Sequence, residues 1–154
     1  MSNSLRTKMW KAMAESPIFM IGLNKNADHS EPMHAQLDKD ASGHFWFYTT
    51  KDNRIAEGGK AMAQYSSIDH ELFACIGGHL VEETDQDIID KYWSKKVEAW
   101  YKEGKTDPSL KMMRFELDNA EVWTQDPSFV GMLKLSTGAT IAPHEMGEHE
   151  KLDL

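Results

Sequence analysis

Short apolar segments separated by brief turns occupy the chain between residues 18 and 82. In PMHAQLD at 32–38, apolar and polar side chains alternate, as in a strand with one face in water. Connections this short favour antiparallel neighbours, because parallel strands need a crossover of about a dozen residues or more. The strands expected here are 18–23, 32–38, 44–50, 63–68 and 72–82.

Helices are expected at three places in the chain. Residues 5–15 and 85–101 carry apolar side chains at helical spacing, and a short helix is expected to begin after Arg54. The whole pattern indicates a β-rich α+β fold, most simply a small antiparallel barrel with helices outside it.

Extended segments are expected in the second half as well. Residues 110–124 are expected to form two pieces divided at Asp118-Asn119, and 129–135 a final strand or an irregular apolar return. Gly77-Gly78 predicts a bulge or a sharp coil within the strand 72–82.

Size and charge restrict the class of protein. The chain has 154 residues, of which 40% are apolar and 27% charged, which predicts one globular domain over 1–154 with flexible tails at 1–7 and 143–154. The formal net charge of −8 argues against broad binding to nucleic acid or to an anionic membrane. No window is long and apolar enough for a membrane span, and the first residues lack a secretory apolar region, so we expect a cytoplasmic protein.

The cysteine and the histidines of the sequence do not indicate a nucleophilic or metal site. The single cysteine, Cys75, lies in an apolar run and is expected to be a buried core thiol. His144 and His149 are five residues apart, whereas a helical zinc motif needs a spacing of four. We therefore expect no metal site and a polar tail in water.

The stretch HFWFYTTKDNRIAEGGKAM at 44–62 combines an aromatic strand with a polar corner. Thr49 and Thr50 end the strand, and Lys51 and Arg54 follow before the expected helix start. Free N–H groups at a helix start, together with two cations, suit a phosphate group. The alternative is an exposed strand–helix corner with ordinary solvated cations.

A phosphorylated aromatic cofactor fits this corner better than the other chemistries considered. The edges of the segments 33–37 and 45–49 can supply a flat floor with backbone polar groups along its rim. Trp100 or Trp123 can supply aromatic cover for the open face of a ring.

An ordered set of segments resembles one known family. They are Pro32-Met33-His34-Ala35-Gln36, Phe45 to Lys51, Asn53-Arg54-Ile55, Trp93 with Ala99-Trp100-Tyr101, Gly104, Asp107-Pro108, and Ala120-Glu121-Val122-Trp123. Over residues 8–135 the chain resembles the pyridoxamine 5′-phosphate oxidase-like family with the FMN-binding split barrel, most closely its general stress protein branch.

The resemblance implies a six-stranded antiparallel split β-barrel with flanking helices, and a homodimer with two FMN sites at the subunit interface. It implies that the phosphate lies near Lys51 and Arg54, and that Trp100 and Trp123 lie near the flavin, from either subunit. The implied cofactor-binding residues are Met33, His34, Gln36, Phe47, Thr49, Thr50, Lys51, Arg54, Trp100 and Trp123.

The chain departs from this branch at Glu31, where the branch often has Arg, which would lower the affinity for FMN if that Arg holds phosphate. It also lacks the basic C-terminal substrate motif of the true oxidases, so vitamin B6 synthesis is not expected. Two functions remain open: a flavin-dependent oxidoreductase of unknown substrate, or a non-catalytic flavin-binding stress, sensor or carrier protein. No side chain is an obvious acid or base, so no catalytic residue is named.

Overall fold

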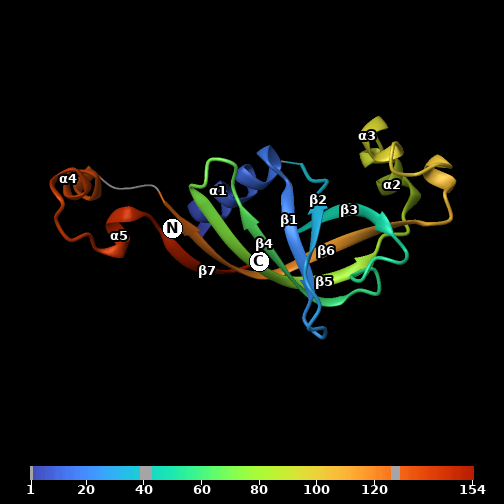
Figure 1. Ribbon diagram of the computed structural model, residues 1–154, viewed down its shortest axis with the longest axis horizontal. Helices are drawn as coiled ribbons and strands as arrows, with labels where there is room; N and C mark the ends of the chain where they lie inside the picture. Colours follow the sequence, from blue (N-terminus) through green and yellow to red (C-terminus); the bar gives the residue numbers. More distant parts are fainter. Residues whose placement is uncertain (1, 39–42, 126–128) are drawn as a thin grey trace.

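The structure is a computed structural model that describes residues 2–38, 43–125 and 129–154. Its centre is one antiparallel sheet in the order β2-β1-β4-β5-β6-β3, with β7 paired to β6 (Figure 1). The strands are β1 (Ile18–Leu23), β2 (Glu31–His34), β3 (His44–Thr50), β4 (Gly59–Ser66), β5 (Leu72–Glu82), β6 (Leu110–Thr124) and β7 (His149–Asp153). The helices are α1 (Ser2–Glu15), α2 (Gln86–Tyr92), α3 (Lys95–Glu98), α4 (Phe129–Thr137) and α5 (Pro143–Met146), with a 3-10 turn, η1 (Gly104–Thr106).

The two outer strands of the six-strand path meet and close the barrel. Just beyond β2, the Gln36 amide donates to the Trp46 carbonyl on β3 at 2.6 Å, and the Trp46 amide donates back at 3.0 Å. The expected β-rich α+β fold is therefore confirmed, with β7 as an additional strand.

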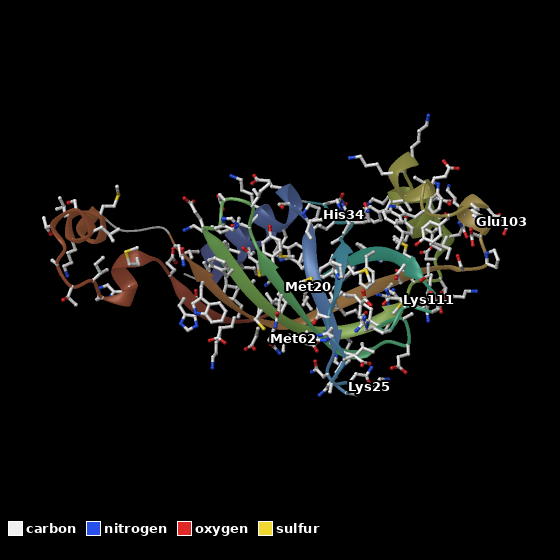
Figure 2. The ribbon with its side chains drawn as sticks, viewed as in Figure 1. Met20, Lys25, His34, Met62, Glu103 and Lys111 are labelled. Atoms are coloured by element: carbon white, nitrogen blue, oxygen red, sulfur yellow. The ribbon has the colours of Figure 1, made fainter. Side chains whose placement is uncertain are left out.

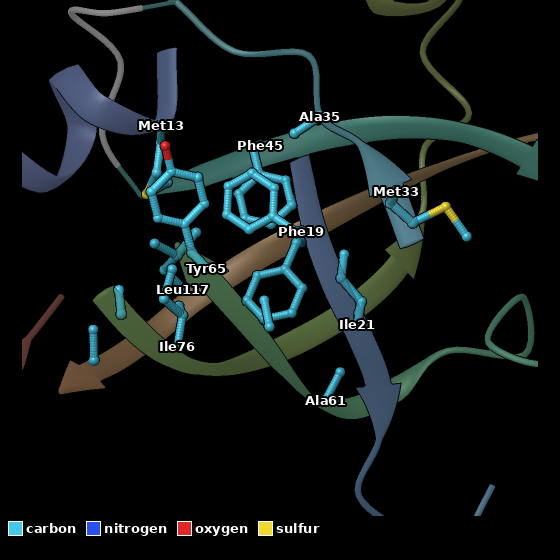
Figure 3. Close-up of a cluster of buried hydrophobic side chains, with 14 of the residues drawn as sticks. Met13, Phe19, Ile21, Met33, Ala35, Phe45, Ala61, Tyr65, Ile76 and Leu117 are labelled. Carbon is cyan, nitrogen blue, oxygen red and sulfur yellow. The ribbon is translucent and has the colours of Figure 1, made fainter. Parts of the chain in front are cut away.

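Aromatic rings from strands on different sides of the barrel fill its interior (Figure 3). Phe45 of β3 stacks on Phe19 of β1 at 4.5 Å between ring centroids, and on Phe115 of β6 at 5.0 Å. Because β1 and β3 are not neighbours in the sheet order, the Phe19–Phe45 contact crosses the interior. Helix α1 adds apolar side chains such as Met13 to this core, and the Tyr65 hydroxyl donates to the Ala12 carbonyl at 2.6 Å.

The expected bulge is present where β5 bends. The pairing of β5 with β6 shifts between Gly77 and Gly78, whose partners are Asn119 and Leu117, so Asp118 has no opposite residue. The expected division of 110–124 into two pieces is wrong, because β6 continues through the bulge as one strand. A Cβ on Gly78 would lie 2.1 Å from the Glu116 carbonyl oxygen, which explains the glycine at this close approach.

The helix expected after Arg54 is absent, and residues 51–58 form successive turns. The Asn53 side chain accepts from the Ile55 amide at 3.0 Å, so it occupies a donor near the start of the expected helix. Gly58 and Gly59 then have φ of 76° and 112°, which is outside the helical region.

The expected helix 85–101 is two short helices, α2 and α3, rather than one. Trp93 is extended (ψ 133°), and the Ser94 side chain caps α3 by accepting from the Val97 amide. The Trp93 ring lies 5.5 Å from Tyr48 and 6.0 Å from Tyr101, so packing on β3 stabilises the break.

Both chain ends are more structured than expected. The segment 1–7, expected as a tail, lies largely in α1, and its Leu5 is fully buried. Residues 129–135 lie in α4 instead of the expected strand or irregular return, and β7 pairs with β6 where a tail was expected. Leu152 of β7 completes the core, which gives the physical reason for the additional strand. None of the described helices has the length and apolar character needed to cross a membrane.

Candidate functional site

The corner after β3 is held in place by hydrogen bonds to the segment that leads into β6. The Lys51 amide donates to the Ser109 carbonyl at 2.9 Å, and the Tyr101 hydroxyl donates to the Thr49 carbonyl at 2.9 Å. Thr49 is buried, whereas Thr50 lies partly in solvent and its hydroxyl donates to the Asp52 carboxylate at 2.5 Å. The backbone of the corner is therefore fixed and the side chain of Lys51 is exposed.

Arg54 lies on the same run of turns but already has an acidic partner. Its Nε donates to Glu31 Oε1 at 2.7 Å, and its Nη1 donates to the His29 carbonyl at 3.3 Å. Among the described residues, by contrast, none of the ion pairs involves Lys51. Lys51 and Arg54, which the sequence places together at the expected phosphate site, thus differ in how freely each could bind a ligand.

A third cation, Lys111 of β6, lies opposite Thr49 and was missed by sequence reasoning (Figure 2). Its Nζ donates to the Ala56 carbonyl at 2.6 Å and lies 3.8 Å from a Glu82 carboxylate oxygen. Only the register between β3 and β6 brings this lysine to the corner, and nothing local in the sequence indicates that register.

The expected floor for a ring divides into core and surface residues. The side chains of Met33 and Phe47 belong to the hydrophobic core, which leaves only their backbone for a ligand outside the barrel. His34 is exposed beside Met33 (Figure 2). Gln36 is partly buried, and its backbone is used in the barrel closure.

The two tryptophans expected near a ring lie at opposite ends of the fold. Trp100 follows α3, directly before Tyr101, and is 84% exposed. Trp123 lies 13 residues along β6 from Leu110, the partner of Thr50, which is about 40 Å of strand before curvature is considered. Figure 1 likewise shows α3 at the opposite end of the sheet from the β6–β7 pairing. One protomer cannot place both rings on one ligand.

Trp123 is part of a preformed aromatic pair. Its ring stacks on that of His149 at 4.9 Å between centroids, with 6° between the planes, and His149 Nε2 lies 2.7 Å from Glu121 Oε1. His149 on β7 therefore contacts Trp123 and Glu121. Within the described part of the chain, no group of three or more metal-binding side chains is clustered.

The outer face of β1, β4, β5 and β6 mixes exposed apolar side chains with polar ones such as Gln64 and Glu121. Ile18, Met20 and Trp123 are 51%, 42% and 38% exposed. A cleft of about 380 Å³ on this face is lined by residues that include Met62, Cys75, Asn119 and Glu121. Met20 and Met62 come from the neighbouring strands β1 and β4 (Figure 2).

Cys75 is half-buried on this face rather than in the core, so the expectation of a buried core thiol is wrong. Partial burial, followed by the nearby carboxylate of Glu121, raises the pKa of the thiol. A raised pKa disfavours the thiolate and so argues against a nucleophilic cysteine.

A buried carboxylate, Glu83, anchors the segment that leads from β5 to α2. It accepts from Trp46 Nε1 at 2.9 Å and from Arg114 Nη1 at 2.8 Å. Burial by itself would raise the pKa of Glu83, but the bonds from Trp46 and Arg114 outweigh it and hold the pKa below the ordinary value of 4.5.

The tyrosines beside β3 titrate far from neutral pH. Burial, and then nearby Asp90, raise the pKa of Tyr48, and burial raises that of Tyr101 to about 12. Neither these groups nor Glu83 would exchange a proton readily near pH 7.

A family comparison covers most of the chain. Residues 5–142 match the family described as pyridoxamine 5′-phosphate oxidase like. No curated protein sequence matches the chain.

Several solved structures share the fold over nearly their full lengths. The general stress FMN/FAD binding protein of Xanthomonas citri is 39% identical, with a TM-score of 0.74 over 82% of this chain and 93% of that protein. A general stress family protein of Xanthomonas campestris is 38% identical, with a TM-score of 0.75 over 84% and 92%. A protein described as general stress protein 26 from a Jannaschia species is 25% identical, with a TM-score of 0.83 over the whole of both chains.

Proposed function

The chain belongs to the pyridoxamine 5′-phosphate oxidase-like family, and on this basis we propose that it binds FMN in a site shared by two subunits of a homodimer. The observation that carries the proposal is the corner after β3, where Lys51 and Arg54 follow a rigid strand end on the protein surface. The similarity to the Xanthomonas citri protein described as FMN/FAD binding supports a flavin as the ligand.

The donors at the corner fit the phosphate end of FMN. Lys51 presents an exposed ammonium group, and Arg54 presents a guanidinium group held by the His29 carbonyl and Glu31. Both groups can make charge-assisted hydrogen bonds to phosphate oxygens. The phosphate would depend on these side chains and on Thr50, because the structure has no helix start at the corner.

The ring end of FMN would lie against the outer rim formed by His34, Gln36 and the end of β3. Within one protomer this rim has no aromatic cover from Trp123. We propose that a second copy packs over the exposed side chains of Ile18, Met20 and Trp123 on the outer face of β1, β4, β5 and β6, and brings its own Trp123 to the ring. A closed two-fold dimer would cover the exposed outer face of both subunits and bring each Trp123 to the partner's ring, because it buries the same patch on each subunit.

The chemistry proposed is oxidoreduction with an unknown substrate. A bound flavin would supply hydride and single-electron transfer, while the protein would hold its phosphate, orient its ring and restrict water. A flavin-binding sensor or carrier without turnover is the alternative. It is favoured by the raised pKa values of Tyr48 and Tyr101 and the lowered pKa of Glu83, which lie further from neutral pH than the ordinary values do. We propose a cytoplasmic location for either function. A nucleic-acid partner is not proposed, in keeping with a net charge of −8.

The test is flavin binding by the purified protein. After incubation with FMN, FAD or riboflavin and removal of the excess, FMN should remain with about one flavin per subunit, and the protein should elute as a dimer. Retention of none of the three flavins would contradict the proposal.

Addition of reduced nicotinamide under anaerobic conditions then separates the two functions. Rapid bleaching of the flavin absorbance followed by reoxidation in air supports the oxidoreductase. A tightly held flavin that stays oxidised supports the sensor or carrier.

A further inference from the structure

We infer that Glu31 competes with the ligand's phosphate group for Arg54, and so sets how strongly this protein distinguishes a phosphorylated flavin from an unphosphorylated one. The inference rests on the proposed function, because it concerns the same corner. It begins from the 2.7 Å contact between Arg54 Nε and Glu31 Oε1, which joins the turn 51–58 to the first residue of β2.

The geometry of the guanidinium group makes the competition direct. Arginine grips a phosphate best with two parallel N–H groups along one edge. In Arg54, Nε is occupied by Glu31 and Nη1 by the His29 carbonyl, so each of the two usable edges already has one donor in use. A two-point grip on phosphate therefore requires one of these contacts to open, and a carboxylate that stays beside Arg54 repels the phosphate.

The other charges around the corner strengthen the influence of Glu31 on phosphate binding. Asp52 accepts from the Thr50 hydroxyl, and Glu82 lies 3.8 Å from Lys111, so the acids nearly balance the cations. With Arg54 neutralised by Glu31, Lys51 is the one corner cation outside the ion pairs of the described residues. Removal of the Glu31 charge would restore a second cation for the ligand.

The chain contains a matched control for this carboxylate. Glu57 lies at the other end of the same turn and also bonds to the β1–β2 connection, with Lys25 Nζ at 3.4 Å and Asn26 Nδ2 at 3.3 Å. Replacement of Glu57 removes the same charge from the same surface without freeing Arg54.

The experiment measures dissociation constants for FMN and riboflavin by flavin fluorescence at low ionic strength, where surface charges are least screened. Glu31→Gln should bind FMN about fivefold more tightly than the parent, as expected for loss of one exposed ion pair, with riboflavin unchanged. Glu57→Gln should leave both constants unchanged. In an Arg54→Ala background, the gain from Glu31→Gln should be smaller, because only the direct repulsion between Glu31 and the phosphate is then relieved.

Circular dichroism of each variant checks that the fold is kept. The inference is overturned if Glu31→Gln leaves the FMN constant unchanged or weakens it, since a weaker constant would mean that Glu31 positions Arg54 for the phosphate. It is also overturned if the same gain persists without Arg54. If the parent and every variant bind neither flavin, the proposed function fails, and this inference fails with it.

Discussion

The sequence predicts that Lys51 and Arg54 lie together near a phosphate, but the surroundings of the two side chains differ. Both follow β3 on the surface, and only Arg54 has a carboxylate partner among the described residues. Each charge-assisted bond to phosphate is worth about 1.5–3 kcal/mol, and an exposed site lies at the lower end of that range. Lys51 should therefore contribute more of the phosphate affinity than Arg54.

The double variant Lys51→Ala with Arg54→Ala should weaken FMN binding by about 3 kcal/mol, or roughly a hundredfold, because both cationic donors are lost. Titration of the protein with FMN, followed by flavin fluorescence, measures the change. The control is Lys25→Ala, an exposed lysine of the β1–β2 connection that pairs with Glu57 (Figure 2). An unchanged FMN affinity in the double variant would exclude this corner as the phosphate site.

Glu83 predicts a pH dependence of stability. Its pKa is lowered in the folded protein, so its contribution is fully present above its unfolded-state pKa and is lost as the pH falls through the folded-state pKa. Glu83→Gln should cost about 2 kcal/mol of unfolding free energy at pH 7, since two charge-assisted bonds are weakened. The difference in unfolding free energy between parent and variant should narrow once the pH falls below 4.5, the ordinary pKa of a glutamate.

Urea unfolding at pH 7 and in acid measures both free energies. The matched control is Glu116→Gln, which pairs with the same Arg114 at 3.2 Å but has a side chain 46% exposed, and so should change stability little. A loss of unfolding free energy in Glu83→Gln that is the same at pH 7 and in acid would contradict this account.

At the scale of elements, the bulge between β5 and β6 decides how the sheet curves into a barrel. Gly78 faces the Glu116 carbonyl oxygen so closely that no Cβ fits, whereas a Cβ on Gly77 would meet the side chain of Asn119 at 2.9 Å. The Glu116 carbonyl belongs to the backbone and cannot move aside, whereas the side-chain amide of Asn119 can rotate away. The two adjacent glycines therefore have different tolerances to substitution.

Gly78→Ala should destabilise the protein by about 3 kcal/mol, because the backbone of β6 must shift. Gly77→Ala should cost less than about 1 kcal/mol, because Asn119 can rotate. Thermal and urea unfolding of the two variants provide the comparison. Equal losses would show that the close approach at Gly78 is not the reason for the glycine.

At the scale of the whole molecule, Trp123 lies far from the corner of its own chain, so the proposed flavin site would use the Trp123 of a second copy. A variant with Lys51→Ala and Arg54→Ala keeps its own Trp123, and a Trp123→Ala variant keeps its own corner. A heterodimer of the two would contain one intact site and one doubly altered site if Trp123 acts across the interface.

Subunit exchange between these variants should therefore restore FMN binding to about a quarter of all sites, since half of the dimers are mixed. FMN is supplied at a concentration at which neither variant alone is loaded. Flavin retained after gel filtration measures the restoration. If mixing restores no flavin although mixed dimers form, Trp123 does not complete the partner's site.

The amino-acid sequence by itself determined the presence of the first five strands, the glycine bulge and the family, because apolar alternation, turn residues and glycine preferences act over a few neighbouring residues. It misjudged the bounds of β2 and β4, which both begin and end earlier than expected. It misplaced the helix after Arg54, since an Asn53 side-chain bond and two glycines outweighed the weak local helical pattern. Only the tertiary structure decided that β7 joins β6 and that Lys111 reaches the corner. It also decided that Glu31 holds Arg54. These outcomes depend on strand register and on contacts between distant parts of the chain, which no local pattern records.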